Sequence, residues 1–564
     1  MNEFKPKLFS VLKNYTKKQF LKDVVSGIIV AVIALPLSIA LAIASGVSPE
    51  QGLYTAIFGG FLVSFLGGSR VQIGGPTGAF MVIVLGVITD FGFDGLVIAT
   101  IMAGIIMILF GLTKLGSIIK FIPYPIITGF TSGIALVIFS SQINDFFGLG
   151  ITNMPSEFFE KWHAYILNFK NINLIATLIG VLSLLIIIFW PKISKKIPGT
   201  LIALVVSALI VYLFKLDVAT IGSTFGQLST NIPLPSFPAV TFERIKSLIP
   251  AAFVIAFLGS VESLLSAVVS DGMIGSKHNS NMELVAQGTA NIGSAIFGGI
   301  PVTGALARTV ANIKNGGRTP VAGMVHAITL LIFLVSLMPL IQLVPLSALA
   351  AVLFIVAYNM SEWREFKSLL KSPKSDILVL LTTFTLTVAI DLVVAIEVGL
   401  VLSMFLFMKR MSEVSGISVK SLDSTENIDN KDFNFEEESQ KHNALKGVMM
   451  YQINGPFFFG AAHKFVEAIN KLDTSIKYLI IGMKHVPAMD ATAIHSFKSS
   501  LKVCKSKGIS VLITGLKDQP RKALTNALLI DSIGNDRIFE TIEEAYAYAK
   551  TNLINTEIKK DDLE

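Results

Sequence analysis

The sequence predicts a polytopic α-helical membrane protein with a small α/β domain at its C-terminal end. The chain has 564 residues, of which 52% are hydrophobic and only 15% are charged. Soluble domains carry about 25% charged residues, so this composition is typical of a protein that lies in a lipid bilayer. Long apolar runs continue to residue 408, and after Arg410 the pattern changes to short alternating β-type and helical runs. These observations divide the chain into a membrane part and a soluble part.

The membrane part contains fourteen apolar runs, each of which is a candidate span. About 20 apolar residues in a helix suffice to cross a bilayer. An even number of crossings leaves both ends of the chain on the same side. The runs cover residues 24–44, 52–68, 71–89, 95–116, 124–145, 172–190, 199–215, 247–270, 283–300, 303–313, 320–341, 344–358, 376–390 and 392–408.

The distribution of basic residues predicts the orientation in the membrane. The connections 146–171 and 216–243 contain few Lys or Arg residues, whereas the N-terminal segment and residues 409–410 are basic. Because positively charged loops stay in the cytoplasm, we expect a multi-pass protein of the plasma (inner) membrane with both termini cytoplasmic. The same rule accounts for the net charge of +7 without a nucleic-acid partner. The single cysteine, Cys504, excludes a disulfide framework.

Two of the runs contain glycine and proline inside the apolar stretch. Residues 74–80 have the sequence GGPTGAF, and residues 298–305 have the sequence GGIPVTGA. Both residue types disfavour a helix interior, so we expect unwound backbone, which survives at membrane depth only inside the protein or along a cavity. The breaks fall in the third and tenth runs and share the tripeptide Thr-Gly-Ala. Corresponding breaks predict two repeats around a transport site, whereas the alternative is two packing kinks.

The two breaks predict a binding site for an anion. Helices that begin at Thr77 and Thr303 would aim their positive ends and free amides at one point, without any basic side chain. Arg308 lies one turn beyond Gly304 and adds a permanent positive charge. An alternative role for Arg308 is a structural ion pair with Glu262. The candidate substrate-binding residues are Pro76, Thr77, Gly78, Ala79, Thr303, Gly304, Ala305 and Arg308.

Glu262 predicts that anion binding is coupled to a cation. It is the only charged residue between Ser247 and Ser270. A carboxylate at the centre of a span costs about 2.5 kcal/mol or more, and such a residue usually faces a pathway or a bound cation. A bare carboxylate repels an anion, so a proton or a co-bound cation on Glu262 would raise the affinity for the anion. Ser266 shares the helical face of Glu262, and the two oxygens form a candidate Na+ site. No other cofactor is predicted.

The C-terminal part predicts a soluble cytoplasmic domain without an active site. Residues 446–453, 477–483 and 509–515 have the pattern of buried strands, and helical runs lie at about 460–471, 491–505, 520–528 and 541–552. We find no Ser/His/Asp arrangement or metal-ligand cluster, so the chain is not expected to be an enzyme. The predicted domains are an N-terminal segment 1–22, a membrane domain 23–410, a linker 411–445 and a soluble domain 446–564.

Three stretches of the chain resemble the SulP (SLC26-type) anion transporters. They are residues 23–54 (DVVSGIIVAVIALPLSIALAIASGVSPEQGLY), 259–272 (GSVESLLSAVVSDG) and 281–317 (NMELVAQGTANIGSAIFGGIPVTGALARTVANIKNGG). The soluble part resembles a STAS domain, with Asp490-Ala491-Thr492-Ala493 at its strand-to-helix turn. The sequence Ala34-Leu35-Pro36-Leu37-Ser38 is closest to the bicarbonate-transporter branch. Many sulfate-transporting members have Gln at the position of Leu37.

The resemblance implies two inverted seven-segment repeats, organised as a core domain that moves against a gate domain in an elevator-type cycle. In the bicarbonate branch, residues that match Glu262 and Ser266 help to bind sodium. This chain has Glu where that branch has Asp, and Leu306 where that branch supplies a threonine oxygen. The STAS domain implies a homodimer and a cytoplasmic partner. Thr492 matches a phosphorylation position in related soluble STAS proteins and is a weak regulatory candidate.

The sequence therefore predicts secondary active transport of a small inorganic anion, bicarbonate or sulfate, coupled to Na+ or H+. Two alternatives stay open: an anion channel or uncoupled exchanger, and a membrane-anchored signalling module in which the STAS domain is the active part. The choice of anion depends on pocket volume, because backbone amides bind bicarbonate, sulfate and carboxylates with similar chemistry.

Overall fold

The computed structural model describes two compact units. One contains residues 1–403 and the other contains residues 404–564, with α19 (Leu392–Val414) crossing the boundary. The described residues are 4–117, 123–151, 154–155, 157–194, 197–390, 392–414, 416–421 and 447–561.

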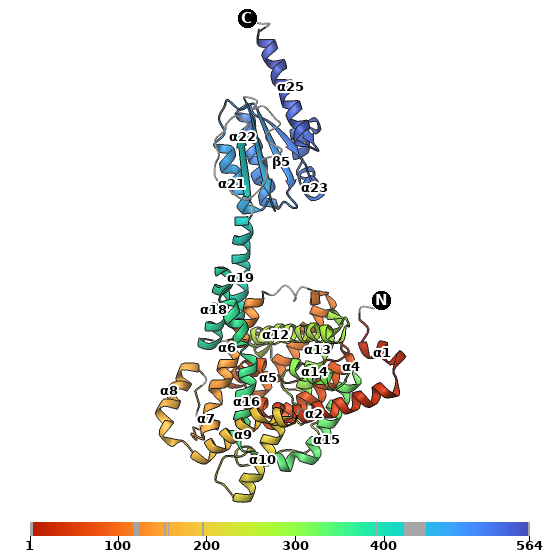
Figure 1. The fold of residues 1–564 in the computed structure, drawn as a ribbon, viewed down its shortest axis with the longest axis vertical. Helices are drawn as coiled ribbons and strands as arrows, with labels where there is room; N and C mark the ends of the chain where they lie inside the picture. The colour runs from red at the N-terminus through yellow and green to blue at the C-terminus, as the bar shows by residue number, and fades with distance from the viewer. Residues whose placement is uncertain are drawn as a thin grey trace. The chain divides into compact units, whose positions relative to one another are not determined.

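The first unit is a helical membrane domain (Figure 1). Seven of its described helical segments are long and apolar enough to cross a membrane, and α10 is a shorter apolar helix. Its helices are α1 (Lys7–Val11), α2 (Lys17–Ala44), α3 (Pro49–Tyr54), α4 (Gly60–Leu66), α5 (Met81–Leu112), α6 (Tyr124–Ser141), α7 (Ile143–Phe147), α8 (Phe158–Asn168), α9 (Leu174–Ile193), α10 (Gly199–Phe214), α11 (Ile221–Phe225), α12 (Phe242–Ile274), α13 (Ser280–Ile296), α14 (Leu306–Lys314), α15 (Val321–Ile341), α16 (Leu346–Met360), α17 (Trp363–Leu369) and α18 (Lys374–Ala389).

Each of the fourteen apolar runs lies on one or more of these helices, except the last, which lies on α19. The second run is divided between α3, a π-helical turn at Thr55–Gly59 and α4. The third and fourth runs are joined in α5, which bends where Gly92 adopts a φ of 70°. Helix α2 begins at Lys17, inside the segment that the sequence assigned to an N-terminal region ending at residue 22. The hydroxyl of Thr16 caps it by accepting from the Gln19 N–H.

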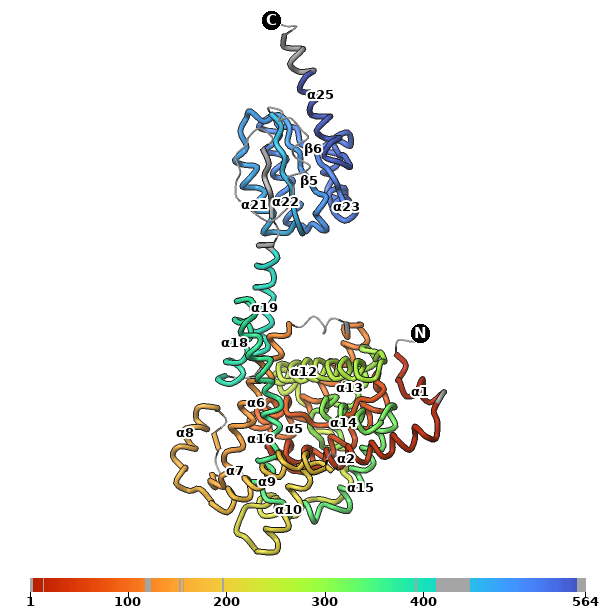
Figure 2. The backbone as a smooth tube through the Cα atoms, in the orientation of Figure 1, coloured from red at the N-terminus to blue at the C-terminus, as the bar shows by residue number. Residues whose placement is uncertain are grey.

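The helix packing repeats after seven segments, as an inverted repeat requires. Helix α5 packs against α12, and the equivalent helices of the other half, α15 and α2, pack in the same way. In the same manner, the pair α6 and α18 corresponds to the pair α16 and α9. Figure 2 shows α12 and α13 side by side above α5, which contacts both. The predicted fold of two inverted seven-segment repeats is therefore confirmed.

The membrane helices form two groups according to their contacts. We call α2–α5 and α12–α15 the core group, and α6–α10 and α16–α19 the gate group. The strongest contacts join helices within a group, and fewer contacts join the groups, mainly from α16 and α10 to α2 and from α6 to the first break. This division positions the site, because both interrupted segments belong to the core group.

The second unit is a five-stranded sheet with helices on both faces. The strand order is β3-β4-β5-β6-β7, with β3 antiparallel to β4 and the other neighbours parallel. Its main core lies under α21, α22, α23 and α24, and α25 packs on the opposite face. The elements are β3 (Gly416–Ser421), β4 (Val448–Asn454), α21 (Phe459–Asn470), β5 (Tyr478–His485), α22 (Ala491–Ser506), β6 (Ser510–Thr514), α23 (Asp518–Asn526), α24 (Leu529–Ile533), β7 (Ile538–Phe539) and α25 (Ile542–Asp561).

The three predicted strands and four predicted helices of this unit are confirmed as β4, β5, β6, α21, α22, α23 and α25. Strand β3 was not predicted and lies within the segment 411–445 that the sequence assigned to a linker, most of which, residues 422–446, is outside the described part of the chain. Strand β7 and helix α24 were also missed. They contain two and five residues, too few to show a hydrophobic period.

Candidate functional site

The two interrupted segments meet in a short antiparallel pair inside the core group. Strand β1 (Gly74–Gly75) pairs with strand β2 (Thr303–Gly304), with Gly75 opposite Thr303 and Gly74 opposite Gly304. The prediction that the breaks come together is confirmed. A Cβ atom on Gly75 would overlap the guanidinium of Arg308, and one on Gly304 would overlap the side-chain amide of Gln72. Both positions therefore need glycine because side chains lie directly against the backbone.

Each break is followed by the start of a helix. Thr77 is extended, with a φ of −128°, and precedes the 3₁₀ turn η3 (Gly78–Phe80) that leads into α5. After the second break, Ala305 caps α14, and its N–H donates to the Ile73 carbonyl over 2.8 Å. Amides in the first turn of a helix have no acceptor within that helix. Both helix starts therefore offer N–H groups and a partial positive charge at the place where the segments meet.

Glu262 contacts the first break. The hydroxyl of Thr77 donates to the Glu262 carboxylate over 3.0 Å. Glu262 is half-buried on α12, between fully buried stretches of that helix. Glu262, the lone acid of its apolar run, is therefore linked by the Thr77 hydroxyl to the place where the two breaks meet.

The second break is fixed to α12 by its threonine. The hydroxyl of Thr303 lies 2.6 Å from the Ser263 hydroxyl and donates to the Gly259 carbonyl over 3.0 Å. The Gly304 N–H donates to the Ser263 hydroxyl over 3.1 Å. All of these groups are buried, so the hydroxyl of Thr303 is used in holding the backbone of the break.

Arg308 is buried and forms no ion pair with any described residue. Only 2% of its surface is exposed, and one terminal nitrogen donates to the Ser38 hydroxyl and the Pro76 carbonyl, each over 3.2 Å. The other terminal nitrogen, Nη1, has no partner among the described residues. The alternative role of Arg308, an ion pair with Glu262, is not formed in this structure, where the partner of the acid is Thr77. Burying a guanidinium with only neutral hydrogen-bond partners is costly.

Ser266 lies one turn beyond Glu262 and is almost fully buried. Its hydroxyl lies 3.5 Å from the hydroxyl of Thr309 on α14. Thr309 in turn accepts from the Ile73 N–H, just before the first break. The two oxygens of the candidate Na+ site therefore contact different partners, Thr77 for the acid and Thr309 for the serine.

A buried polar cluster holds the chain that leads into the first break. The Glu283 carboxylate on α13 accepts from the N–H groups of Gly68 and Ser69 over 2.8 and 2.9 Å. The side-chain amide of Gln72 donates to the Ser263 carbonyl over 3.1 Å. Burying such a carboxylate is tolerated because backbone N–H groups compensate its charge.

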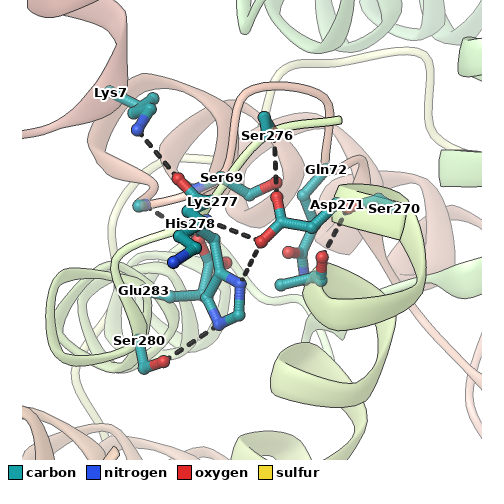
Figure 3. A network of polar contacts seen from close by, with 12 residues as sticks. Lys7, Ser69, Gln72, Ser270, Asp271, Ser276, Lys277, His278, Ser280 and Glu283 are labelled. Carbon is teal, nitrogen blue, oxygen red and sulfur yellow. Dashed lines mark hydrogen bonds and ion pairs between the residues drawn. The ribbon is translucent and has the colours of Figure 1, made fainter. Parts of the chain in front are cut away.

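The turn between α12 and α13 is fixed by a second part of the same cluster (Figure 3). Asp271 accepts from the His278 backbone N–H, and its carboxylate lies 2.7 Å from His278 Nδ1. The hydroxyls of Ser276 and Ser280 contact Asp271 and the second ring nitrogen of His278, respectively. This arrangement orients α12, which carries the acid, relative to α13, which holds the first break.

In the C-terminal unit, Thr492 is exposed in the first turn of α22. Asp490 caps that helix by accepting from the Ala493 N–H over 2.7 Å. Burial raises the pKa of the Cys504 thiol to about 11, so the single cysteine is not a thiolate at neutral pH.

Three residues that contact the site were missed by the sequence analysis: Ser38, Gln72 and Ser263. Each is a polar residue inside an apolar stretch, which is the signal that could have found it. Serine hydroxyls in helices also bond their own backbone, as Ser260 does to the Ala256 carbonyl. A polar residue inside an apolar stretch therefore cannot be assigned to the site from the sequence without knowledge of the fold.

Comparisons with known proteins place this geometry in a family. The model of the sulfate permease family matches residues 20–383, and the model of the STAS domain matches residues 441–545. The chain is 41% identical over 539 residues to the putative sulfate transporter YvdB of Bacillus subtilis (strain 168), which covers 94% of this chain and 98% of that protein. It is 32% identical over 546 residues to the bicarbonate transporter BicA of Picosynechococcus sp., with 93% of each protein covered.

A solved structure has the same fold over nearly the whole chain. The murine Slc26a9 anion transporter in the inward-facing state superposes with a TM-score of 0.86 at 18% identity, covering 97% of this chain and 94% of that one. At this identity the likeness shows the fold alone. Together, the family models, the full-length relatives and the paired breaks identify the chain as a member of the sulfate permease family, a membrane transporter with a STAS domain rather than an enzyme.

Proposed function

We propose that the protein is a secondary active transporter of a small inorganic anion, bicarbonate or sulfate, coupled to Na+ or H+. The names of two full-length relatives support these two substrates, since one is called a putative sulfate transporter and the other a bicarbonate transporter. The anion lies between the helix starts of η3 and α14, within reach of Arg308. An elevator-type movement of the core group against the gate group carries it across the membrane.

The observation that carries this proposal is the buried guanidinium of Arg308, whose Nη1 has no hydrogen-bond partner among the described residues. An arginine that is 2% exposed stays charged, and it lacks an acidic partner in the described part of the chain. Two helix starts add partial positive charge at the same place. A small anion would compensate all three charges and accept from Arg308 Nη1, which has no partner among the described residues.

The coupling to a cation follows from the contact between Thr77 and Glu262. When Glu262 is ionised, its charge lies one hydroxyl group away from the proposed anion position. A proton or Na+ on the carboxylate removes the repulsion, so cation binding raises anion affinity, and by linkage the anion raises cation affinity equally. Ser266 is the second oxygen proposed for Na+, and binding there requires its hydroxyl to leave Thr309.

We also propose that the protein lies in the plasma (inner) membrane as a homodimer, with both termini and the STAS domain in the cytoplasm. The exposed lysines of the N-terminal segment support this orientation, since positive segments stay cytoplasmic. A cytoplasmic partner of the STAS domain and phosphorylation of Thr492 belong to the same proposal.

The deciding experiment is uptake of labelled bicarbonate, sulfate and fumarate by purified protein in proteoliposomes, with Na+ and H+ gradients imposed in turn. We expect saturable uptake of one of the two inorganic anions, stimulated by one of the two gradients. Uptake that ignores both gradients would favour the uncoupled exchanger, and large single-channel currents would favour the channel.

A further inference from the structure

The core group and the gate group touch at Gly78, where the first break ends. We infer that Met360 and Ile138 form an apolar wall of the gate group that closes over the anion site, with Gly78 as the point of contact. This inference rests on the proposed transport function and adds to it the residues that seal one side of the site.

The geometry at Gly78 is tight. Met360 is the last residue of α16, and Ile138 lies in α6, so both belong to the gate group. A Cβ atom on Gly78 would lie 2.6 Å from the sulfur of Met360 and 3.1 Å from the Cδ1 atom of Ile138. The backbone of the first break therefore packs directly against gate side chains, without space for a side chain of its own.

The wall has no polar group to offer an anion. Ile138 is completely buried, and Met360 is partly buried and packs against the main hydrophobic core of the membrane domain. A thioether is at most a weak acceptor, and a methyl group is neither a donor nor an acceptor. An anion at the start of η3 would meet amides and Arg308 on the core side and only apolar atoms on the gate side. The core group can then carry the anion without breaking polar contacts to the gate, while the wall excludes water.

A side chain at position 78 would require the ends of the Met360 and Ile138 side chains to move. The φ of Gly78 lies outside the left-handed region, so alanine could adopt the same backbone conformation. An added methyl group would instead push against Met360 and Ile138 and separate the wall from the break. Gly86, eight residues further along the same segment, provides a matched control, because a Cβ atom added there would have no neighbouring atom within 4 Å.

The test compares Gly78→Ala with Gly86→Ala in proteoliposome uptake. We expect Gly78→Ala to lower coupled uptake about tenfold, and Gly86→Ala to stay within about twofold of the wild type. Monodisperse elution and a retained melting temperature in detergent establish that both variants fold. Equal uptake by the two variants would overturn the inference.

A second variant distinguishes loss of contact with the apolar wall from direct damage to the anion site as the cause of reduced uptake. Shortening the gate residue in Gly78→Ala/Met360→Ala makes room for the added methyl, so we expect the double variant to regain most of the uptake of Met360→Ala alone. If it does not regain uptake, the loss arises in the site itself and the wall is refuted.

A cross-linking measurement that does not depend on transport tests this inference separately from the proposed function. Cysteines at positions 78 and 360, in a Cys504→Ser background, should form a disulfide that is detected in proteolytic peptides by mass spectrometry. If the cross-link forms and the wild-type protein shows no uptake under either gradient, the transport proposal is refuted and the contact stands. Failure to cross-link would refute the contact.

Discussion

The first and second breaks share a backbone arrangement and a tripeptide, but their side chains have different partners. The hydroxyl of Thr77 donates to Glu262, whereas the hydroxyl of Thr303 is occupied by Ser263 and a backbone carbonyl of α12. The tripeptide lies at different places in the two breaks, because Gly78 opens η3 whereas Gly304 lies in β2. The breaks therefore supply a pair of helix starts, and Arg308 on α14 and Glu262 on α12 add opposite charges.

This difference is consistent with the proposed coupling of an anion to a cation. Two helix starts alone would bind an anion from both sides and respond to nothing else. Arg308 adds a permanent positive charge and Glu262 adds an acid, and both side chains contact the first break, through Pro76 and Thr77 respectively. Substitutions of Arg308 and of Glu262 should therefore give different transport defects, and these defects test the comparison.

The largest effect is expected from the second break. Arg308→Gln removes the buried charge but keeps a polar side chain, and truncating one partner of a buried charge interaction costs about 3 kcal/mol or more. We expect saturable uptake to fall about 100-fold, and anion-dependent thermal stabilisation to disappear. Arg364→Gln, at an exposed arginine on α17, is the matched control and should behave as the wild type. Normal uptake by Arg308→Gln would show that the anion does not bind next to Arg308.

The acid should give a defect in coupling rather than in binding. Glu262→Gln keeps the shape and can still accept from Thr77, but it is neutral at every pH. We expect anion exchange to continue. We expect the cation gradient to stimulate uptake about tenfold in the wild type and not at all in this variant. The measurement is uptake with and without the gradient in the same vesicles. Stimulation that survives in Glu262→Gln would place the cation elsewhere.

The two threonines should separate function from stability. Thr77→Val removes a hydrogen bond, worth about 1.5 kcal/mol, that stabilises the ionised Glu262 carboxylate, so we expect the apparent cation affinity to rise about tenfold with little change in melting temperature. Thr303→Val leaves the buried hydroxyl of Ser263 short of a partner, so we expect the melting temperature to fall by about 2–4 °C. Thr77→Ser and Thr303→Ser keep the hydroxyls and are the controls. Identical defects in both valine variants would show that the breaks are functionally equivalent.

The sequence predicted the parts of this site that depend on local composition. Gly and Pro inside apolar runs marked both breaks, and single charges in apolar surroundings marked Glu262 and Arg308. The contact of Arg308 with Ser38 was not predictable in this way, because it joins residues 270 positions apart. The approach of Met360 to Gly78 was hidden for the same reason, since it depends on the packing of helices from different repeats.

Removal of the C-terminal unit should have the smallest effect on anion binding at the two breaks. Deletion of residues 412–564 leaves both breaks, Glu262 and the core of the membrane domain intact, because the two units have separate hydrophobic cores. We expect the anion to stabilise the truncated protein against heat as it does the wild type. The anion concentration that gives half of this stabilisation should stay within about twofold of the wild-type value, because the deletion removes no residue of the site. The full chain with Asp490→Ala, which loses only the cap of α22, is the milder control. Loss of anion binding on truncation, with the membrane domain still folded, would instead support the signalling module, in which the STAS domain is the active part.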